Sequence, residues 1–178
     1  MKIAILGAGN IGTLIGAKLA KLDSTDIFIH ARGEHAASLA VNGITVEGVE
    51  DFSLTPNQYH LSISDVEVNS AFDGLADVIF ICSKAGDVGD LFKLAKRLCH
   101  QDTKILVLSN GLGHLELGVE EFGAHRMIPA TTTHGAWRKN PGSVVWAGLG
   151  SIHLGQISNS PSFEEMKELF SLLEKSGL

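Results

Sequence analysis

Apolar stretches alternate with polar, turn-forming stretches along this chain, and their lengths predict strands and helices in turn. Residues 2–6 form a short apolar run, as a buried strand does. The segment that follows has apolar side chains at the spacing of one helix face, interrupted only by Lys18: Ile11, Leu14, Ile15, Leu19 and Leu22. The chain therefore begins with a strand that leads directly into a helix.

The same alternation continues to the end of the chain. Further strands are expected at residues 26–30, 44–47, 77–82, 104–108 and 126–133. Helices are expected at residues 34–41, 88–99 and 163–175, and a further helix is expected to follow Ser109-Asn110-Gly111 and to end at about residue 122. Residues 48–70 are predicted to form a strand-and-loop excursion, with short strands around Phe52 and Val66. Residues 143–146 and 151–154, separated by Gly148, Leu149 and Gly150, are predicted to pair as a terminal β-hairpin.

Strands that alternate with helices predict an α/β fold with a mostly parallel, doubly wound sheet and helices on both faces. No internal repeat or linker interrupts the pattern, and 178 residues suit one domain. We therefore expect a single Rossmann-like domain over residues 1–178, with the β-hairpin added at its end.

The glycines between the first strand and the first helix have the spacing Gly7-x-Gly9-x-x-Gly12. In this context Gly7 allows a tight turn, Gly9 lets phosphates approach the backbone, and Gly12 lets the helix pack closely on the strand. The amides at the helix start, from Asn10 and Ile11 onward, would face the phosphates. The motif predicts a dinucleotide pyrophosphate site; the alternative is a glycine-rich turn in another α/β fold.

The end of the second strand indicates which dinucleotide is bound. An Asp or Glu there usually accepts the ribose hydroxyls of NAD, but this chain reads His30-Ala31-Arg32, with no carboxylate before Glu34. Arg32 would hold a 2′-phosphate by a charge-assisted contact. The sequence therefore favours NADP(H), with a solvated turn arginine as the alternative. His30 either lines the adenosine end or is a structural histidine.

Composition excludes several classes of protein. The net charge of −6 argues against a nucleic-acid partner, and a hydrophobic fraction of 44% with 19% charged residues is ordinary for a soluble protein. Neither a signal peptide nor a long apolar span is present, so we expect a cytoplasmic protein without a membrane partner. Cys82, at the end of a strand, and Cys99, on a helix face, are expected to be buried and unpaired, with no metal spacing.

Polar residues follow three of the predicted strands, at the sheet edge where ligands bind in doubly wound folds. These segments are Ser83-Lys84-Ala85, Ser109-Asn110-Gly111-Leu112-Gly113 and Thr131-Thr132-Thr133-His134-Gly135-Ala136. A lysine, an amide and a group of hydroxyls at one edge suit a small 2-oxo acid beside a nicotinamide ring. An exposed lysine at a helix start and an Asn-Gly turn are the alternatives for Lys84 and Asn110.

Together with the glycine motif and Ala31-Arg32-Gly33-Glu34-His35, these segments resemble the ketopantoate reductase (2-dehydropantoate 2-reductase) family over essentially the whole chain. The resemblance implies NADPH-dependent reduction of 2-dehydropantoate to pantoate, on the route to pantothenate and coenzyme A. It implies that Lys84 and Asn110 lie on the nicotinamide and substrate side, that Arg32 binds the 2′-phosphate, and that Thr131 to His134 and Ala136 support the cofactor. His134 is expected to be structural, and the histidines at 35, 60, 100, 114, 125 and 153 are expected to be scattered over the surface.

The family has a helical C-terminal domain, with the catalytic lysine and substrate-binding residues, that has no counterpart before Leu178. No certain catalytic residue can therefore be assigned in this chain. We expect a truncated chain that binds NADP(H) but reduces 2-dehydropantoate negligibly, and an exposed docking face that favours self-association, such as a homodimer. The alternatives are a naturally short, non-catalytic NADP(H)-binding module and a reductase of another 2-oxo acid.

Overall fold

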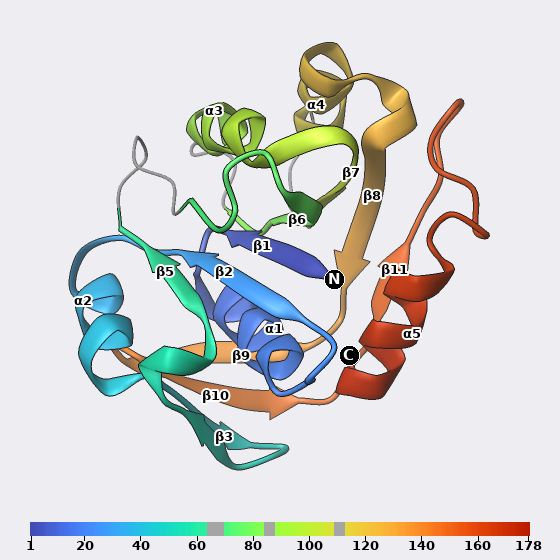
Figure 1. Cartoon of the computed structure of the whole chain (residues 1–178). Helices are drawn as coiled ribbons and strands as arrows, with labels where there is room; N and C mark the ends of the chain where they lie inside the picture. Colours follow the sequence, from blue (N-terminus) through green and yellow to red (C-terminus); the bar gives the residue numbers. More distant parts are fainter. Residues whose placement is uncertain (64–69, 84–87, 109–112) are drawn as a thin grey trace.

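A computed structural model describes residues 1–63, 70–83, 88–108 and 113–178 (Figure 1). Its helices are α1 (Asn10–Ala20), α2 (Gly33–Asn42), α3 (Val88–Leu98), α4 (His114–Phe122) and α5 (Lys167–Ser176), with short 3-10 helices η1 (Pro56–Gln58) and η3 (Ala124–Arg126). Its strands are β1 (Lys2–Leu6), β2 (Asp26–His30), β3 (Ile44–Gly48), β4 (Phe52–Leu54), β5 (His60–Ser62), β6 (Ala76–Ile81), β7 (Cys99–Val107), β8 (Met127–Thr132), β9 (Gly135–Asn140), β10 (Ser143–Gly148) and β11 (Ile152–Leu154).

In the described part of the chain, seven strands form the main sheet, in the order β11-β8-β7-β6-β1-β2-β5. All neighbours are parallel except β11, which runs antiparallel to β8. On β1, Ile3 and Ile5 face the layer that contains α1, whereas Ala4 and Leu6 face the layer that contains α3. Both faces of the strand are buried, which explains why its sequence is a continuous apolar run. The predicted α/β fold with a mostly parallel sheet is confirmed.

A second, four-stranded sheet in the order β4-β3-β10-β9 covers the outer side of α1 (Figure 1). Helix α1 contacts β1 and β2 on one side and β3, β9 and β10 on the other. Residues 12–19 are therefore buried all round the helix, and Lys18 with them. Lys18 forms an ion pair with Glu50, and its Nζ lies 5.0 Å from the centroid of the Trp146 ring. Lys18, the polar residue on the apolar face of this helix, therefore connects α1 to the second sheet.

The predicted pairing of residues 143–146 with 151–154 is wrong. Strand β10 instead pairs antiparallel with β9 and parallel with β3, while β11 adds to the main sheet beside β8. The hairpin turn lies between Asn140 and Ser143, where Gly142 has a φ of 80°. Gly150 lies in the segment that carries the chain from one sheet to the other. A β-hairpin does exist near the end of the chain, but its first strand is β9.

Two smaller expectations also change. Cys99 begins β7 rather than ending a helix, because α3 stops at Leu98. Helix α5 begins only at Lys167, so Phe163 precedes it and is 60% exposed. The strand expected near Phe52 is β4, and the one expected near Val66 falls outside the described residues.

Both cysteines are unpaired, as predicted, and each is partly rather than fully buried. Burial raises the pKa of the Cys82 thiol to about 12 and also raises the pKa of Cys99.

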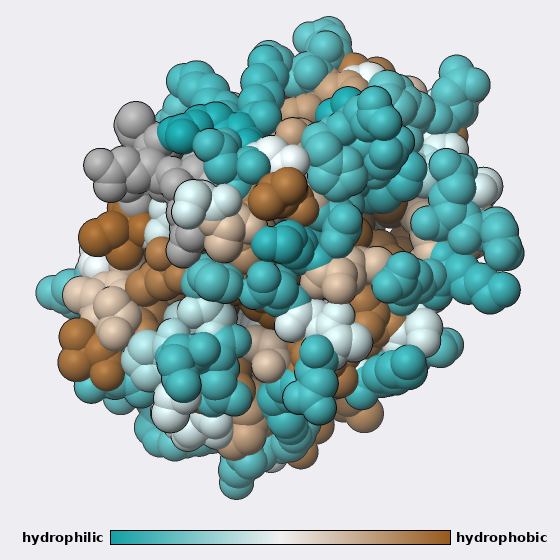
Figure 2. Space-filling view, viewed as in Figure 1, coloured by the Kyte–Doolittle hydropathy of each residue, from teal (hydrophilic) through white to brown (hydrophobic). Residues whose placement is uncertain are grey.

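On the face shown in Figure 2, hydrophilic residues cover most of the surface, and apolar residues occur in small groups between them. Among the described residues, no helix is long and apolar enough to cross a membrane.

Candidate functional site

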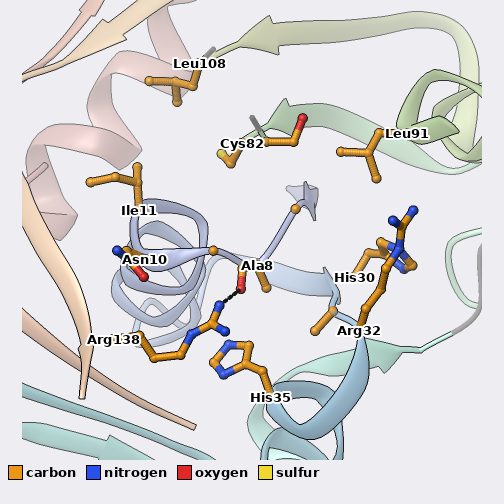
Figure 3. Close-up of a pocket in the computed structure, with 14 residues that line it drawn as sticks. Ala8, Asn10, Ile11, His30, Arg32, His35, Cys82, Leu91, Leu108 and Arg138 are labelled. Atoms are coloured by element: carbon orange, nitrogen blue, oxygen red, sulfur yellow. Dashed lines mark hydrogen bonds between the residues drawn. The ribbon is translucent and has the colours of Figure 1, made fainter. Parts of the chain in front are cut away.

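A pocket of about 870 Å³ lies at the carboxyl ends of β1, β2 and β6, in front of the first turn of α1. This is the edge at which doubly wound sheets bind their ligands. The described residues that line it are Gly7, Ala8, Gly9, Asn10, Ile11, His30, Ala31, Arg32, His35, Cys82, Ser83, Leu91, Leu108 and Arg138 (Figure 3). No carboxylate is among these described residues.

The glycine-rich loop forms the centre of this pocket. Gly7 has a φ of 93°, and a Cβ on it would lie 2.8 Å from the carbonyl oxygen of Cys82. A Cβ on Gly12 would lie only 2.3 Å from the carbonyl oxygen of Gly7, so the helix approaches the loop as closely as a glycine allows. By contrast, no atom of the described residues lies within 4 Å of the Cβ position of Gly9. The loop therefore has backbone packed behind it and open space in front of Gly9.

The loop presents a helix N-terminus to the pocket. Gly9 is the N-cap of α1, and no acidic residue lies in the first turn. The first amides of a helix have no partner within the helix and carry the positive end of its dipole. Asn10 and Ile11, which begin this helix, line the pocket. The arrangement suits an anion that binds in close contact with these backbone amides.

A second helix N-terminus borders the same pocket. Arg32 is the N-cap of α2 and is exposed at the end of β2, beside the buried His30. The pKa of Asp90 is lowered mainly by its hydrogen bond from Lys93 and, to a smaller extent, by the charge of Arg32. Arg32 therefore lies on the side of the pocket nearer α3.

His35 was expected to be a surface residue, but it is buried at the base of this pocket. Its Nδ1 accepts a hydrogen bond from the Gly142 amide at 3.0 Å, so its Nε2 carries the proton. The Thr13 Oγ1 lies 3.0 Å from that Nε2 and itself donates to the Ala8 carbonyl oxygen at 3.2 Å. This chain of hydrogen bonds connects the β9–β10 turn to α2, to α1 and to the glycine-rich loop.

Burial of His35, with a smaller contribution from the charge of Arg138, lowers its pKa from 6.5 to about 4. The imidazole is therefore neutral near pH 7, which its role as an acceptor from Gly142 requires. Sequence patterns gave no sign of this burial, because the partners of His35 come from distant segments.

Arg138 was also missed by the sequence analysis. It lies on β9 in the second sheet, and its Nη2 donates to the Ala8 carbonyl oxygen at 3.1 Å (Figure 3). The pocket thus has an arginine on each side of the loop, one from β2 and α2 and one from the second sheet. The local sequence, Trp137-Arg138-Lys139, resembles any exposed strand and contains no motif that marks the arginine.

Of the residues predicted to bind the cofactor, Gly7, Gly9, Asn10, Ile11 and Arg32 line the pocket, and Gly12 packs behind the loop. Lys84 and Asn110 lie outside the described residues, so their roles stay predictions.

Ala136 lies on β9 opposite Trp146 and is not among the described residues that line the pocket, so its role too stays a prediction.

His134 is buried, and its Nδ1 accepts hydrogen bonds from the Trp146 indole at 3.3 Å and from the Gly150 amide at 3.0 Å. Burial, followed by the charge of Lys18, lowers its pKa. These contacts suit the structural role expected of His134.

His114 is buried, contrary to expectation. Within the described ranges, His, Cys, Asp and Glu side chains form no group that could hold a metal ion.

Comparison with known proteins agrees with this architecture. The family model described as ketopantoate reductase PanE/ApbA matches residues 3–159. A 2-dehydropantoate 2-reductase of Pyrococcus horikoshii is 34% identical over 173 residues, which are 96% of this chain and 53% of the relative. One from Lactococcus lactis subsp. lactis is 26% identical and is matched by 100% of this chain, over 55% of its own length.

Solved structures give the same result. The crystal structure of 2-dehydropantoate 2-reductase from Geobacter metallireducens superposes with a TM-score of 0.85 at 28% identity, over 100% of this chain and 56% of that one. A D-mandelate dehydrogenase in a ternary structure with NADH and anilino(oxo)acetate has the same fold, with a TM-score of 0.83 at 24% identity over 100% of this chain and 55% of that one. The chain spans about half the length of the relatives it matches. With a Rossmann-like sheet, a glycine-rich loop at its carboxyl edge and a family match over most of its residues, this chain belongs to the ketopantoate reductase PanE/ApbA family.

Proposed function

We propose that residues 1–178 bind NADP(H) and form the cofactor half of an NADPH-dependent 2-dehydropantoate 2-reductase. The observation that supports this most directly is the pocket itself: a helix N-terminus behind a close-packed glycine loop, with Arg32 at the end of β2. Membership of the family supports the reaction class, since its named relatives are 2-dehydropantoate 2-reductases.

The described residues fit a 2′-phosphorylated dinucleotide. The space in front of Gly9 admits a phosphate against the backbone, and the first amides of α1 are placed to donate to it. Arg32 would hold the 2′-phosphate, and the carboxylate that an NAD site usually has at this position is absent from the described lining. Bound NADPH would supply the hydride, and the chain's part is to bind and orient it.

Reduction of a 2-oxo acid also requires the carbonyl to be held near the nicotinamide and its developing charge to be stabilised. We assign the nicotinamide side to Lys84 and Asn110, on the family resemblance. Because the reductases it matches are about twice as long, we expect the 178 residues alone to bind the cofactor but to show negligible turnover. NADPH oxidation in the presence of 2-dehydropantoate would be followed spectrophotometrically beside a full-length relative. Comparable rates for the two proteins would contradict this expectation.

Replacing Arg32 by methionine is expected to weaken NADPH binding by about 10- to 100-fold and to leave NADH binding nearly unchanged. The reason is that a charge-assisted hydrogen bond to a phosphate contributes roughly 1.5–3 kcal/mol, and NADH has no 2′-phosphate. Calorimetric titration of both cofactors measures the two affinities.

Arg97→Met is the matched control, because Arg97 is exposed on α3 and does not line the pocket. It should leave both affinities unchanged. Preference of the unmodified chain for NADH would contradict the NADP(H) assignment, and binding of neither cofactor would contradict the proposed function.

A further inference from the structure

Arg138 reaches the pocket from a part of the fold outside the strand–loop–helix unit. It lies on β9, the edge strand of the second sheet, 130 residues beyond the loop residue it contacts. Its Nη2 donates to the carbonyl oxygen of Ala8, between the first two glycines of the motif. In Figure 3 its guanidinium lies beside His35 and points toward Ala8. One contact therefore fixes the position of the guanidinium at the pocket.

Most of the binding capacity of this guanidinium is left for a ligand. A guanidinium has five N–H donors, and a single hydrogen bond at 3.1 Å is described for Arg138. The residue is exposed, and no carboxylate pairs with it among the described residues. Its neighbour Lys139, by contrast, forms an ion pair with Glu47 at 2.7 Å. A fixed, uncompensated positive charge in a pocket is a site for an anion.

The position of Arg138 relative to α2 indicates which anion. Its charge lowers the pKa of His35, which lies in the first turn of α2, so the guanidinium is close to this helix N-terminus. Arg32 is the N-cap of the same helix. Both arginines therefore border the start of α2 from different sides: Arg32 begins there, with its side chain extending past His30 toward Leu91, and Arg138 reaches it from the second sheet beside Ala8 (Figure 3).

No described residue that lines the pocket opposes an anion at this position; Asp90, whose pKa is lowered in part by the charge of Arg32, lies on α3 and does not line the pocket. His35 is neutral near pH 7, and the first amides of α2 carry the positive end of its dipole. Glu34 also lies in the first turn, but it is exposed and is not among the residues that line the pocket. The first amides of α1 are placed to bind the pyrophosphate. The anion expected at the start of α2 is therefore another phosphate group of the dinucleotide.

We infer that Arg138 and Arg32 form a two-arginine clamp for the 2′-phosphate of the dinucleotide. The inference rests on the proposed NADP(H)-binding function and adds to it a specificity residue from the second sheet. Strand β9 thereby becomes part of the cofactor site, and the bond to Ala8 holds Arg138 in place before the ligand arrives. A guanidinium already fixed loses less conformational freedom on binding than a free side chain.

The test compares Arg138→Met with Lys139→Met, which removes the neighbouring positive charge on the same strand. Each variant and the unmodified chain are titrated calorimetrically with NADPH, NADH, adenosine 2′,5′-bisphosphate and 5′-AMP. The last two ligands differ in the 2′-phosphate and need no nicotinamide site. Thermal unfolding confirms that each variant is folded, and Arg138→Lys tests whether charge without the planar fork is enough.

The clamp predicts that Arg138→Met weakens binding of NADPH and of adenosine 2′,5′-bisphosphate by about 10- to 100-fold, leaving NADH and 5′-AMP within about threefold. Lys139→Met should change none of them by more than about threefold, and Arg138→Lys should restore part of the loss. Equal losses for NADPH and NADH would overturn the clamp, because they would show that Arg138 acts only through the loop. Unchanged NADPH binding would overturn it too.

The unmodified chain separates this inference from the proposed function. If it binds both dinucleotides equally well and Arg138→Met has no selective effect, the pocket binds dinucleotides and the clamp alone fails. If the unmodified chain binds none of the four ligands, the proposed function fails and the clamp fails with it.

Discussion

Gly12→Ala is expected to abolish dinucleotide binding and to destabilise the fold, whereas Gly9→Ala should abolish binding alone. The methyl group that Gly12→Ala introduces would lie 2.3 Å from the Gly7 carbonyl oxygen, which is backbone and cannot turn aside. Helix α1 would have to move away from β1, at a cost of about 3 kcal/mol, the upper end of the usual range for overpacking. Because α1 is packed between two sheets, the movement would disturb both of its interfaces.

Gly9→Ala is the matched control for the fold. Gly9 has a φ of −74°, and no atom in the described part of the chain lies within 4 Å of its Cβ position, so the free energy of unfolding should change by less than about 1 kcal/mol. A methyl group would nevertheless occupy the space in front of the loop where we place the pyrophosphate. Urea unfolding and calorimetric titration with NADPH measure the two effects separately. Wild-type binding by Gly9→Ala would place the phosphates elsewhere, and wild-type stability of Gly12→Ala would contradict the packing argument.

Acid is expected to destabilise the fold through His35. Its pKa is about 4 in the folded protein and 6.5 in the unfolded chain, so the unfolded chain takes up the proton first as the pH falls. The stability that neutral His35 provides is therefore complete above pH 6.5 and is lost progressively between pH 6.5 and about 4. A difference of this size corresponds to about 3 kcal/mol, most of which is lost over this interval.

The measurement is the free energy of unfolding in urea at neutral pH and at two acidic values within that interval, for the unmodified chain and for His35→Gln. The variant should lose roughly 2–3 kcal/mol less than the unmodified chain over this interval. His153→Gln, at an exposed position on β11, is the control and should keep the full acid sensitivity. Identical pH profiles for His35→Gln and the unmodified chain would show that His35 does not carry the effect.

Local sequence was a good guide wherever the structure depends on near neighbours. The strand at residues 2–6, the glycine turn and the helix that follows were all predicted, because their apolar spacing and their glycines report directly on the backbone. The place of Arg32 beside the pocket was predicted for the same reason, since the end of β2 is set by the length of its own apolar run. The pairing of residues 143–146 with 151–154 failed because any two adjacent strand-like segments separated by glycines resemble a hairpin.

Which residues distant in sequence contact one another was decided only by the tertiary structure. The hydrogen bond from Gly142 to His35 spans 107 residues and that from Arg138 to Ala8 spans 130. No periodic pattern in the local sequence indicates either of them. Lys18 is similar: its sequence position indicates a polar break in an apolar face, and only the second sheet, with Trp146 and Glu50, makes its burial favourable. The sequence by itself therefore determined the glycine loop and the end of β2, where neighbouring residues set the backbone. Packing of the second sheet on α1 decided what surrounds them, because those contacts exist only once distant segments meet.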